Sequence, residues 1–264
     1  MSSLPTTFFG WVGFLLEKYG SLFLNGVGVT LLVAITGTVA GFLIGLLVAI
    51  LRTIPTGPRD PWYKRVPLKA LSVLLGVYIE VFRGTPMIVQ AMVIYYGGMM
   101  VGVRMPVMTA AILIVSVNTG AYMAEIIRGG ILSIDKGQKE AAHAIGMSHW
   151  QSMVYVVLPQ AVRNIMPSIG NEFVVNIKDS SVLNVISVNE LFFQSKSAAG
   201  TYARYFEVFF ITACIYLALT FTVTRLLRLL ERKMDGNVNY IIYGSQSDSK
   251  ASIAVPREEG MPND

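Results

Sequence analysis

The stretch KEAAHAIGMSHWQSMVYVVLPQAVRNIMPSIGNEF, residues 139–173, decides how the rest of the chain is interpreted. It lies between apolar runs long enough to span a bilayer, yet it is too amphipathic and too interrupted to be a span itself. Gly146 can end one short helix, because glycine adopts the left-handed conformation after a last turn at little steric cost. Ser148 and Gln151 have the spacing of a capping box, which predicts the start of a second helix. The stretch therefore predicts a compact helix–turn–helix between two membrane spans.

The second helix of this hairpin is expected to bend or stop at Pro159, since proline lacks an N–H and its ring clashes with the preceding turn. Small side chains at Ala141, Ala142 and Ala144 precede the turn. They would let the surface of another protein approach the helix backbone closely. From the residues alone, the hairpin is equally well interpreted as an interfacial connection between two spans.

Composition places the chain among integral membrane proteins. Its 264 residues are 53% hydrophobic and only 14% charged, whereas about a quarter of the residues in a soluble domain are charged. The net charge of +5 does not indicate nucleic-acid binding, because the Lys and Arg residues fall at the ends of apolar runs. The single cysteine, Cys214, excludes an intrachain disulfide and a thiolate metal site. The N-terminus lacks the basic region of a cleavable signal peptide, so the first apolar run is expected to be a retained span.

Five segments are expected to cross the membrane, since about 20 residues of helix cover about 30 Å of hydrocarbon. Basic segments at 52–69, 128–139 and 225–233 all fall on one side when the number of spans is five, and short basic loops belong in the cytoplasm. The sequence therefore predicts an all-α integral membrane fold with five transmembrane helices, the N-terminus outside and the C-terminus cytoplasmic. The spans are expected at about 24–51, 86–101, 107–127, 165–188 and 206–224, with the cytoplasmic helix–turn–helix loop at 135–163.

The chain is expected to consist of one transmembrane domain with a peripheral segment at each end. Residues 1–19 form a predicted extracytoplasmic N-terminal segment, and residues 20–233 form the transmembrane domain. Residues 234–264 are polar with no apolar face to bury, which predicts a disordered cytoplasmic tail.

The first span contains glycines at regular spacing. Gly37, Gly41 and Gly45 follow one another at four-residue intervals, the small-xxx-small pattern that lets membrane helices pack closely. The alternative interpretation is that glycine is simply common in transmembrane helices.

The fourth predicted span is unusual because it carries Glu172, Lys178 and Asp179. A charge in the bilayer interior costs several kcal/mol on insertion scales, so it usually faces the bundle interior or water. Glu172, Asn176 and Asp179 recur at helical spacing and would form one polar stripe. The candidate substrate path consists of five residues, which offer both charge signs and amides to a zwitterion: Asn118 from the third span and Glu172, Asn176, Lys178 and Asp179 from the fourth. The alternative is that Lys178 and Asp179 neutralise each other or polar neighbours and serve packing.

Several motifs occur in register in the central stretch: Glu140-Ala141-Ala142, Gly146, Ser148-His149-Trp150-Gln151, Leu158-Pro159-Gln160 and Gly170-Asn171-Glu172-Phe173. This series resembles the EAA loop of the permease subunits of bacterial ATP-binding-cassette (ABC) importers, and most of all the polar amino acid permeases of the glutamine, histidine and arginine type. The string from Tyr78 to Pro86 and the Asn-Ile-Lys-Asp-Ser-Ser run at 176–181 resemble further signatures of that subfamily. At His149 the family pattern commonly has an aromatic residue instead.

The resemblance covers about residues 20–233 and implies the permease subunit of an ATP-driven importer for a polar amino acid, multi-pass in the bacterial cytoplasmic (inner) membrane and in contact with its lipid. The implied partners are a second permease subunit, identical or paralogous, a cytoplasmic ABC ATPase dimer and an extracytoplasmic solute-binding protein. ATP and Mg²⁺ are expected in the partner ATPase, and no cofactor or metal in this chain. The residues implied for ATPase coupling are Glu140, Ala141, Ala142, Gly146, Ser148 and Trp150.

The sequence does not indicate an enzyme. It has no Walker-type GxxxxGK[ST] segment to hold ATP phosphates, and no Ser/His/Asp or zinc constellation. A metal site or pH switch at His143 and His149 is one interpretation. Their six-residue spacing places them on different faces of the helix–turn–helix, which favours the interpretation that they are solvated loop residues.

Two rival functions remain from the sequence. An ion-coupled secondary transporter or channel would fit the intramembrane charges, although inverted repeats are not visible. A membrane scaffold would bind a soluble partner through the hairpin without moving solute. The polar stripe does not name which amino acid is carried.

Overall fold

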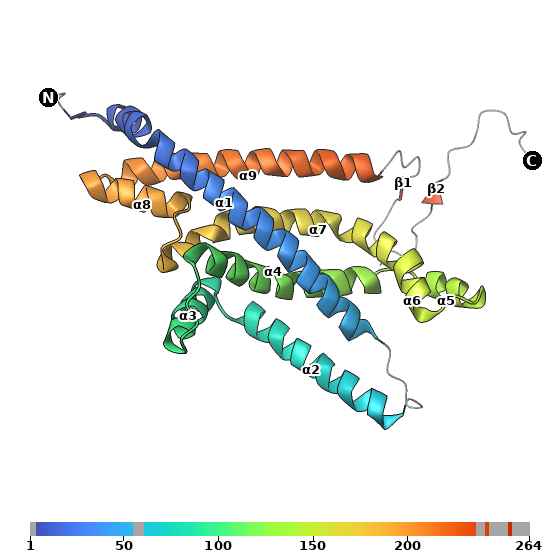
Figure 1. The fold of residues 1–264 in the computed structure, drawn as a ribbon. Helices are drawn as coiled ribbons and strands as arrows, with labels where there is room; N and C mark the ends of the chain where they lie inside the picture. Colours follow the sequence, from blue (N-terminus) through green and yellow to red (C-terminus); the bar gives the residue numbers. More distant parts are fainter. Residues whose placement is uncertain (1–3, 55–60, 236–240, 243–252, 255–264) are drawn as a thin grey trace, which may run out of the picture.

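The computed structural model describes residues 4–54, 61–235, 241–242 and 253–254, nearly all of them helical (Figure 1). The first four helices are α1 (Phe8–Thr53), α2 (Trp62–Gly84), α3 (Met87–Met100) and α4 (Val107–Leu132). They are followed by α5 (Lys136–Ala144), α6 (His149–Ser152), a π-helical turn (Met153–Val157) and α7 (Leu158–Asp179). The bundle ends with a 3-10 segment (Ser180–Ile186), α8 (Leu191–Tyr202) and α9 (Tyr205–Asp235).

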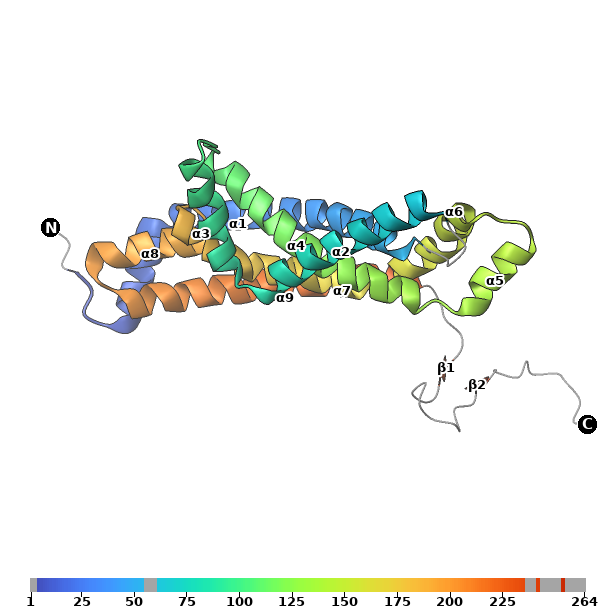
Figure 2. The same cartoon turned by 90° about the horizontal axis from the view of Figure 1, so that it is seen from below.

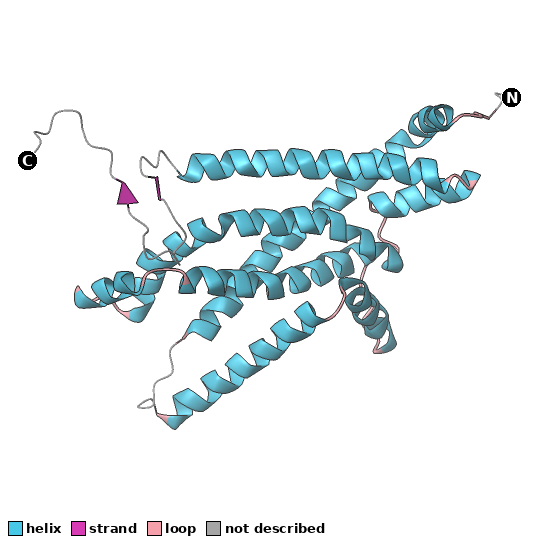
Figure 3. Cartoon of the chain, turned by 180° about the vertical axis from the view of Figure 1, so that it is seen from behind, coloured by secondary structure: helices cyan, strands magenta, loops and turns pink. Residues whose placement is uncertain are grey.

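The predicted all-α class is confirmed for the bundle. Beyond it, two strands of two residues each, β1 (Ile241–Ile242) and β2 (Ile253–Ala254), pair antiparallel (Figure 3). The rest of the predicted tail, from residue 236 onward, lies outside the described residues.

The bundle is elongated, with α5 and α6 at one end and α8 at the other (Figures 1 and 2). We call these the loop end and the α8 end. Three described helices are long and apolar enough to cross a membrane: Phe8–Thr53, Val107–Leu132 and Tyr205–Lys233. α1 exceeds what a crossing requires, because its 46 residues extend about 70 Å at 1.5 Å per residue, against about 30 Å of hydrocarbon.

The first turns of α1 pack against α8 and α9 at the α8 end. A buried cluster that includes Trp11, Leu15 and Phe23 meets Leu191 there. Gly26 lies so close to the start of α8 that a Cβ on it would be 2.8 Å from Leu191 Cα. The excess length of α1 therefore contributes to a second packed core beyond its central part.

The most extensive helix contact is between α1 and α4. A Cβ added at Gly41 would lie 2.7 Å from Thr119 Cβ, and one at Gly45 would lie 2.8 Å from the backbone N of Ala124. At Gly37 an added Cβ would overlap a methyl group of the valine that faces it on α4. Real Cβ atoms do not approach so closely, because dense packing leaves no room for an extra methyl group. The prediction that these glycines permit close helix packing is confirmed.

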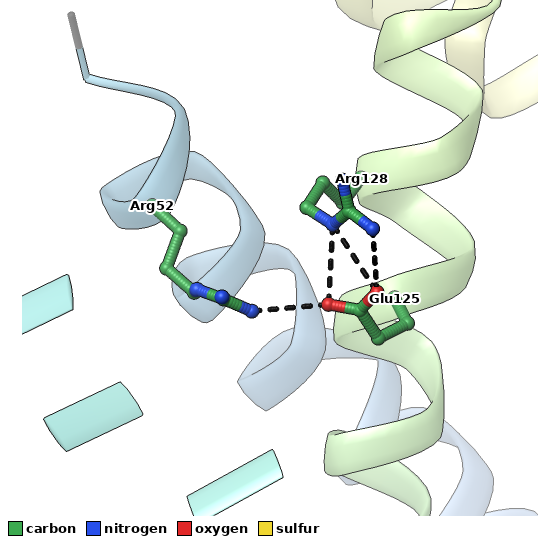
Figure 4. A network of polar contacts seen from close by, with 3 residues as sticks. All are labelled: Arg52, Glu125 and Arg128. Atoms are coloured by element: carbon green, nitrogen blue, oxygen red, sulfur yellow. Dashed lines mark hydrogen bonds and ion pairs between the residues drawn. The ribbon is translucent and has the colours of Figure 1, made fainter. Parts of the chain in front are cut away.

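An ion-pair network joins α1 and α4 at the loop end (Figure 4). Glu125 of α4 accepts from Arg52 Nη1 at 3.0 Å, and its other carboxylate oxygen accepts from Arg128 Nη2 at 2.7 Å. Arg128 lies one turn further along α4, so both arginines converge on one carboxylate. Because Arg52 lies in the last turn of α1, this network fixes the end of α1 against the helix that leads into the loop.

Substitution of Gly45 by alanine is expected to lower the free energy of unfolding by about 1–3 kcal/mol, the usual cost of overpacking. Gly28→Ala in the same helix is the matched control, because nothing lies within 4 Å of a Cβ there. It should leave stability unchanged or slightly raise it, since alanine favours helix. Thermal unfolding of both purified variants in detergent measures the difference, and equal midpoints would contradict the packing argument.

Glu125→Gln is expected to lower the free energy of unfolding by about 1–2 kcal/mol, because charged hydrogen bonds to two arginines are lost. The loss stays below that of a fully buried pair, since the Arg52 and Glu125 side chains are 25% and 22% exposed. Glu17→Gln is the control, as Glu17 is exposed and in none of the described ion pairs. The apparent unfolding temperature in detergent reports both, and high salt should shrink the difference.

Candidate functional site

The loop at 135–163 is built by local capping interactions. Asp135 Oδ1 accepts from the backbone N of Gly137 at 2.6 Å, which starts α5. Gly146 has a φ of +85°, and the next residue, Met147, donates its N–H to Ala142 O at 3.0 Å. That pattern closes the end of a helix and requires the left-handed conformation that glycine adopts most easily. The helix end predicted at Gly146 is confirmed.

The capping box predicted for the second helix is also confirmed. Ser148 Oγ accepts from Gln151 N at 3.3 Å, while Ser148 N donates to Gln151 Oε1 at 2.8 Å. Helical backbone continues without a break from α6 through the π-helical turn into α7, so the second helix does not stop at Pro159 as the sequence analysis allowed. A π-helical turn precedes α7, so Pro159 falls in the first turn of a new helix, where a missing N–H is tolerated.

The outer side of the loop carries apolar side chains that no described residue covers. Ile145 is 79% exposed and Trp150 is 55% exposed. Of the six predicted coupling residues, Glu140, Ala141, Gly146 and Ser148 are exposed beside them, whereas Ala142 is buried against the loop itself. The sequence analysis did not single out Ile145, although a large apolar residue at the turn of a polar hairpin is a recognisable signal.

The inner side of the loop is packed firmly on the bundle. Met153 and Val157 of the loop share one buried cluster with Ala49 of α1 and with residues of α4 and α7. Where α4 meets α7, a Cβ added at Gly130 would overlap a methyl group of Ile165. Interiors packed this closely transmit displacement instead of absorbing it. A force on the exposed side of the loop is therefore carried to α1, α4 and α7 together.

The residues of the predicted polar stripe on α7 lie in different surroundings, since Asn176 is buried whereas Asp179 is exposed. Glu172 and Asp179 lie two turns apart on one face, and Arg83 at the end of α2 is near enough to act electrostatically on Glu172. The Arg83 guanidinium lies 5.4 Å from the centre of the Tyr122 ring. Charges of both signs thus come together from α2 and α7, beside an aromatic ring of α4.

The two amides of the predicted path have hydrogen-bond partners within the bundle. Asn176 Nδ2 donates to Thr38 Oγ1 at 2.8 Å, and its Oδ1 accepts from Thr119 Oγ1 at 3.1 Å. Asn118 Nδ2 donates to Gln90 Oε1 at 2.8 Å. Asn176 therefore joins α7 to α1 and α4, and Asn118 joins α4 to α3. Any substrate role of these amides stays a prediction.

Gln90 has a further structural role that the sequence analysis missed. Its Nε2 donates to Phe82 O and Thr85 O, both at 2.9 Å. These carbonyls lie at the break between α2 and α3, where Pro86 leaves backbone groups without helical partners. A buried glutamine shortly after a Gly-Thr-Pro sequence is the signal that could have identified it.

Lys178 lies on a different face from Glu172, about 120° away at 100° per residue. It lines a hollow between α7 and α9 together with Leu217 and Phe221. Lys178 and Asp179 form no ion pair among the residues that the structure describes. The charge of Lys178 nevertheless acts on Asp179, so both interpretations of these two residues stay predictions.

The loop histidines lie outside the predicted spans. Partial burial, and then the neighbouring Lys139 and His143, hold the pKa of His149 below its usual range. The ring Nδ1 of His143 lies 3.0 Å from Met147 O. Within the described ranges, no group of three or more His, Cys, Asp or Glu side chains is placed to hold a metal ion.

Comparison with known proteins agrees with this geometry. Residues 62–236 match the family described as "binding-protein-dependent transport system inner membrane component". The chain is 40% identical over 215 residues to the glutamine transport system permease protein GlnP of Escherichia coli, covering 81% of this chain and 93% of that protein. It is 33% identical over 215 residues, with the same two coverages, to the arginine transport system permease protein ArtQ of Bacillus subtilis.

Solved structures show the same likeness. A structure described as an amino acid ABC transporter with histidines is 39% identical, with a TM-score of 0.73 over 83% of this chain and 96% of the other. An inward-facing MetNI methionine ABC transporter is 21% identical with a TM-score of 0.62, covering 82% of this chain and 99% of the other, and shares the fold. The resemblance drawn from the central motifs is confirmed. The chain belongs to the family of inner membrane components of binding-protein-dependent transport systems.

Proposed function

We propose that this chain is the permease subunit of an ATP-driven ABC importer, and that it forms the path for a polar amino acid with a second permease subunit. The observation that carries the proposal is the loop at 135–163, which is exposed and apolar on its outer side and packed into the bundle on its inner side. The identity to glutamine and arginine permeases supports a polar amino acid as the substrate. This function makes the chain a transporter component, with ATP hydrolysis in a separate subunit.

The proposed mechanism is helix-in-groove docking of the loop on a cytoplasmic ATPase. Ile145 and Trp150 would fill the groove of that partner, with small or polar residues around them. When the ATPase dimer closes on ATP and Mg²⁺, it moves the loop. Because Met153 and Val157 are packed into the same cluster as α1, α4 and α7, these helices then move as a rigid body and switch access across the membrane.

The proposed topology has five crossings, with the N-terminus outside and the C-terminus in the cytoplasm. α1, α4 and α9 supply three of them, and α7 with its 3-10 extension supplies another. α3 is short, since its 14 residues cover about 21 Å. The end of α2 therefore completes that crossing. In this arrangement the loop end faces the cytoplasm of a bacterium, and the α8 end receives substrate from an extracytoplasmic binding protein.

Substitution of Gly146 separates a conformational role from a docking role. Asn tolerates the left-handed conformation, so Gly146→Asn keeps the loop fold while adding a side chain where nothing lies within 4 Å. Gly146→Leu adds both bulk and backbone strain. If the partner approaches closely at this point, both variants should lose uptake at least tenfold, which corresponds to about 1.4 kcal/mol.

The measurement is uptake in proteoliposomes, with binding of the ATPase to each variant measured in parallel. Gly129→Asn on α4 is the control, because a Cβ at Gly129 likewise meets nothing within 4 Å and the position lies before the loop. Normal uptake by Gly146→Asn together with loss in Gly146→Leu would show that only the backbone conformation matters.

The transport function itself is tested by reconstitution with the partner ATPase and solute-binding protein, and a panel of labelled amino acids. ATP hydrolysis stimulated by one or a few polar amino acids, with their uptake, is the expected result. Uptake that persists when the ATPase lacks its catalytic carboxylate would favour an ion-coupled transporter. ATPase binding without any uptake would favour a scaffold.

A further inference from the structure

A groove between α7 and α9 has the chemistry of an anion site. It consists of two adjoining hollows of about 220 Å³ and about 310 Å³. The larger one is lined by three cationic side chains, Lys178 of α7 and Arg225 and Arg228 of α9. Apolar side chains of both helices complete its walls, among them Val174, Leu217 and Phe221.

The three cations converge because of the helix directions. α7 runs from the loop end toward the α8 end and α9 runs back, as Figures 1 and 3 show. Side chains on a helix lean toward its N-terminus. Lys178 therefore leans toward the loop end, while Arg225 and Arg228 lean toward the α8 end. Side chains from the two helices of this antiparallel pair meet in one hollow, so their charges add instead of dispersing.

No ion pair involves these cations within the described part of the chain. The ion pairs described there join Glu125 to two arginines and Arg204 to Glu207, all outside the groove. Two acids accompany these cations: Asp179, which follows Lys178 and on which its charge acts, and Glu231, which lines the smaller hollow with Arg228. Neither is in an ion pair with the three cations among the described residues. The Arg225 guanidinium instead lies 4.9 Å from the centre of the Phe221 ring.

In a membrane this arrangement favours binding of an anion. Unpaired cations at membrane depth are costly, and basic pockets between transmembrane helices at the cytoplasmic side bind anionic lipid headgroups. Arginine matches phosphate with paired hydrogen bonds. The same groove carries exposed apolar side chains, with Leu217 68% and Phe221 57% exposed, which an acyl chain would cover.

We propose that the α7–α9 groove binds an anionic phospholipid, with Arg225 and Arg228 on its phosphate, Lys178 above it and an acyl chain along Leu217 and Phe221. The apolar wall favours a lipid over a free amino acid, which has no tail to cover it. α7 continues directly from the loop, so a bound lipid braces the helix that the loop moves. The proposal depends on the chain lying in a membrane and not on which solute it carries.

The test compares phosphatidylglycerol with phosphatidylcholine of the same acyl chains, added to the purified full-length chain in detergent. Native mass spectrometry counts retained lipids, and thermal unfolding reports stabilisation. The variant Arg225→Gln/Arg228→Gln removes two cations from the groove. Its control, Arg232→Gln/Lys233→Gln, removes the same charge from the same end of α9 but from residues that do not line the groove.

Phosphatidylglycerol is expected to stay bound and to raise the unfolding temperature, while phosphatidylcholine does neither. The affinity for phosphatidylglycerol should fall roughly thirtyfold in the groove variant, because two cationic contacts are lost. It should remain near the wild-type value in the control variant. Arg225→Lys/Arg228→Lys provides a second variant should the glutamine pair fail to fold. It keeps the charge, loses the paired hydrogen bonds and should show an intermediate affinity.

Three results would overturn the proposal. Equal losses of phosphatidylglycerol affinity in the groove and control variants would mean that binding depends only on the overall surface charge. Equal effects of glycerol phosphate and phosphatidylglycerol would mean an anion site without an acyl chain. A dimer that displaces the lipid, and that disappears in the groove variant, would assign the groove to a second copy of this chain.

Discussion

The close approach of α1 to α4 is the constraint on which the other contacts of the bundle depend. Glycine at 37, 41 and 45 removes three side chains from one face of α1, and the two backbones meet there. Only at this separation do Thr38 and Thr119 both reach Asn176, and Arg52 reach Glu125. Membrane helices gain little from burying apolar surface against each other, so close packing and such polar contacts hold them together.

From this contact, rigidity extends to the loop. Ala49 lies one turn beyond Gly45 in α1, and it belongs to the buried cluster that includes Met153 and Val157. The π-helical turn between α6 and α7 inserts a wider turn at this junction, which rotates the faces of the two helices relative to one another. Such turns often occur at functional sites. Here the turn lets one side of the segment pack inward while Trp150 stays outside.

Features that depend on neighbouring residues were predictable from the sequence. The helix end at Gly146 and the capping box at Ser148 need only residues within one turn, and the glycine spacing in α1 marks a packing face without naming its partner. The surroundings of the α7 residues were not predictable in the same way. Helical spacing relates Glu172, Asn176 and Asp179 to each other by angle, but not to the helices around them. Asn176 proves to face α1 and α4, and the interactions of Arg83 and Gln90 depend on contacts distant in sequence.

The exposure of Ile145 and Trp150 has a consequence for how such a subunit is produced in the cell. Apolar side chains that lie open at a turn are tolerated while a partner covers them, and otherwise they favour aggregation and recognition by quality-control proteases. A chain made in excess of its partner keeps this surface uncovered, whatever the state of its membrane helices. In the proposed assembly the docking loop would therefore also mark subunits that lack their partner, and the supply of partner would limit how many copies persist.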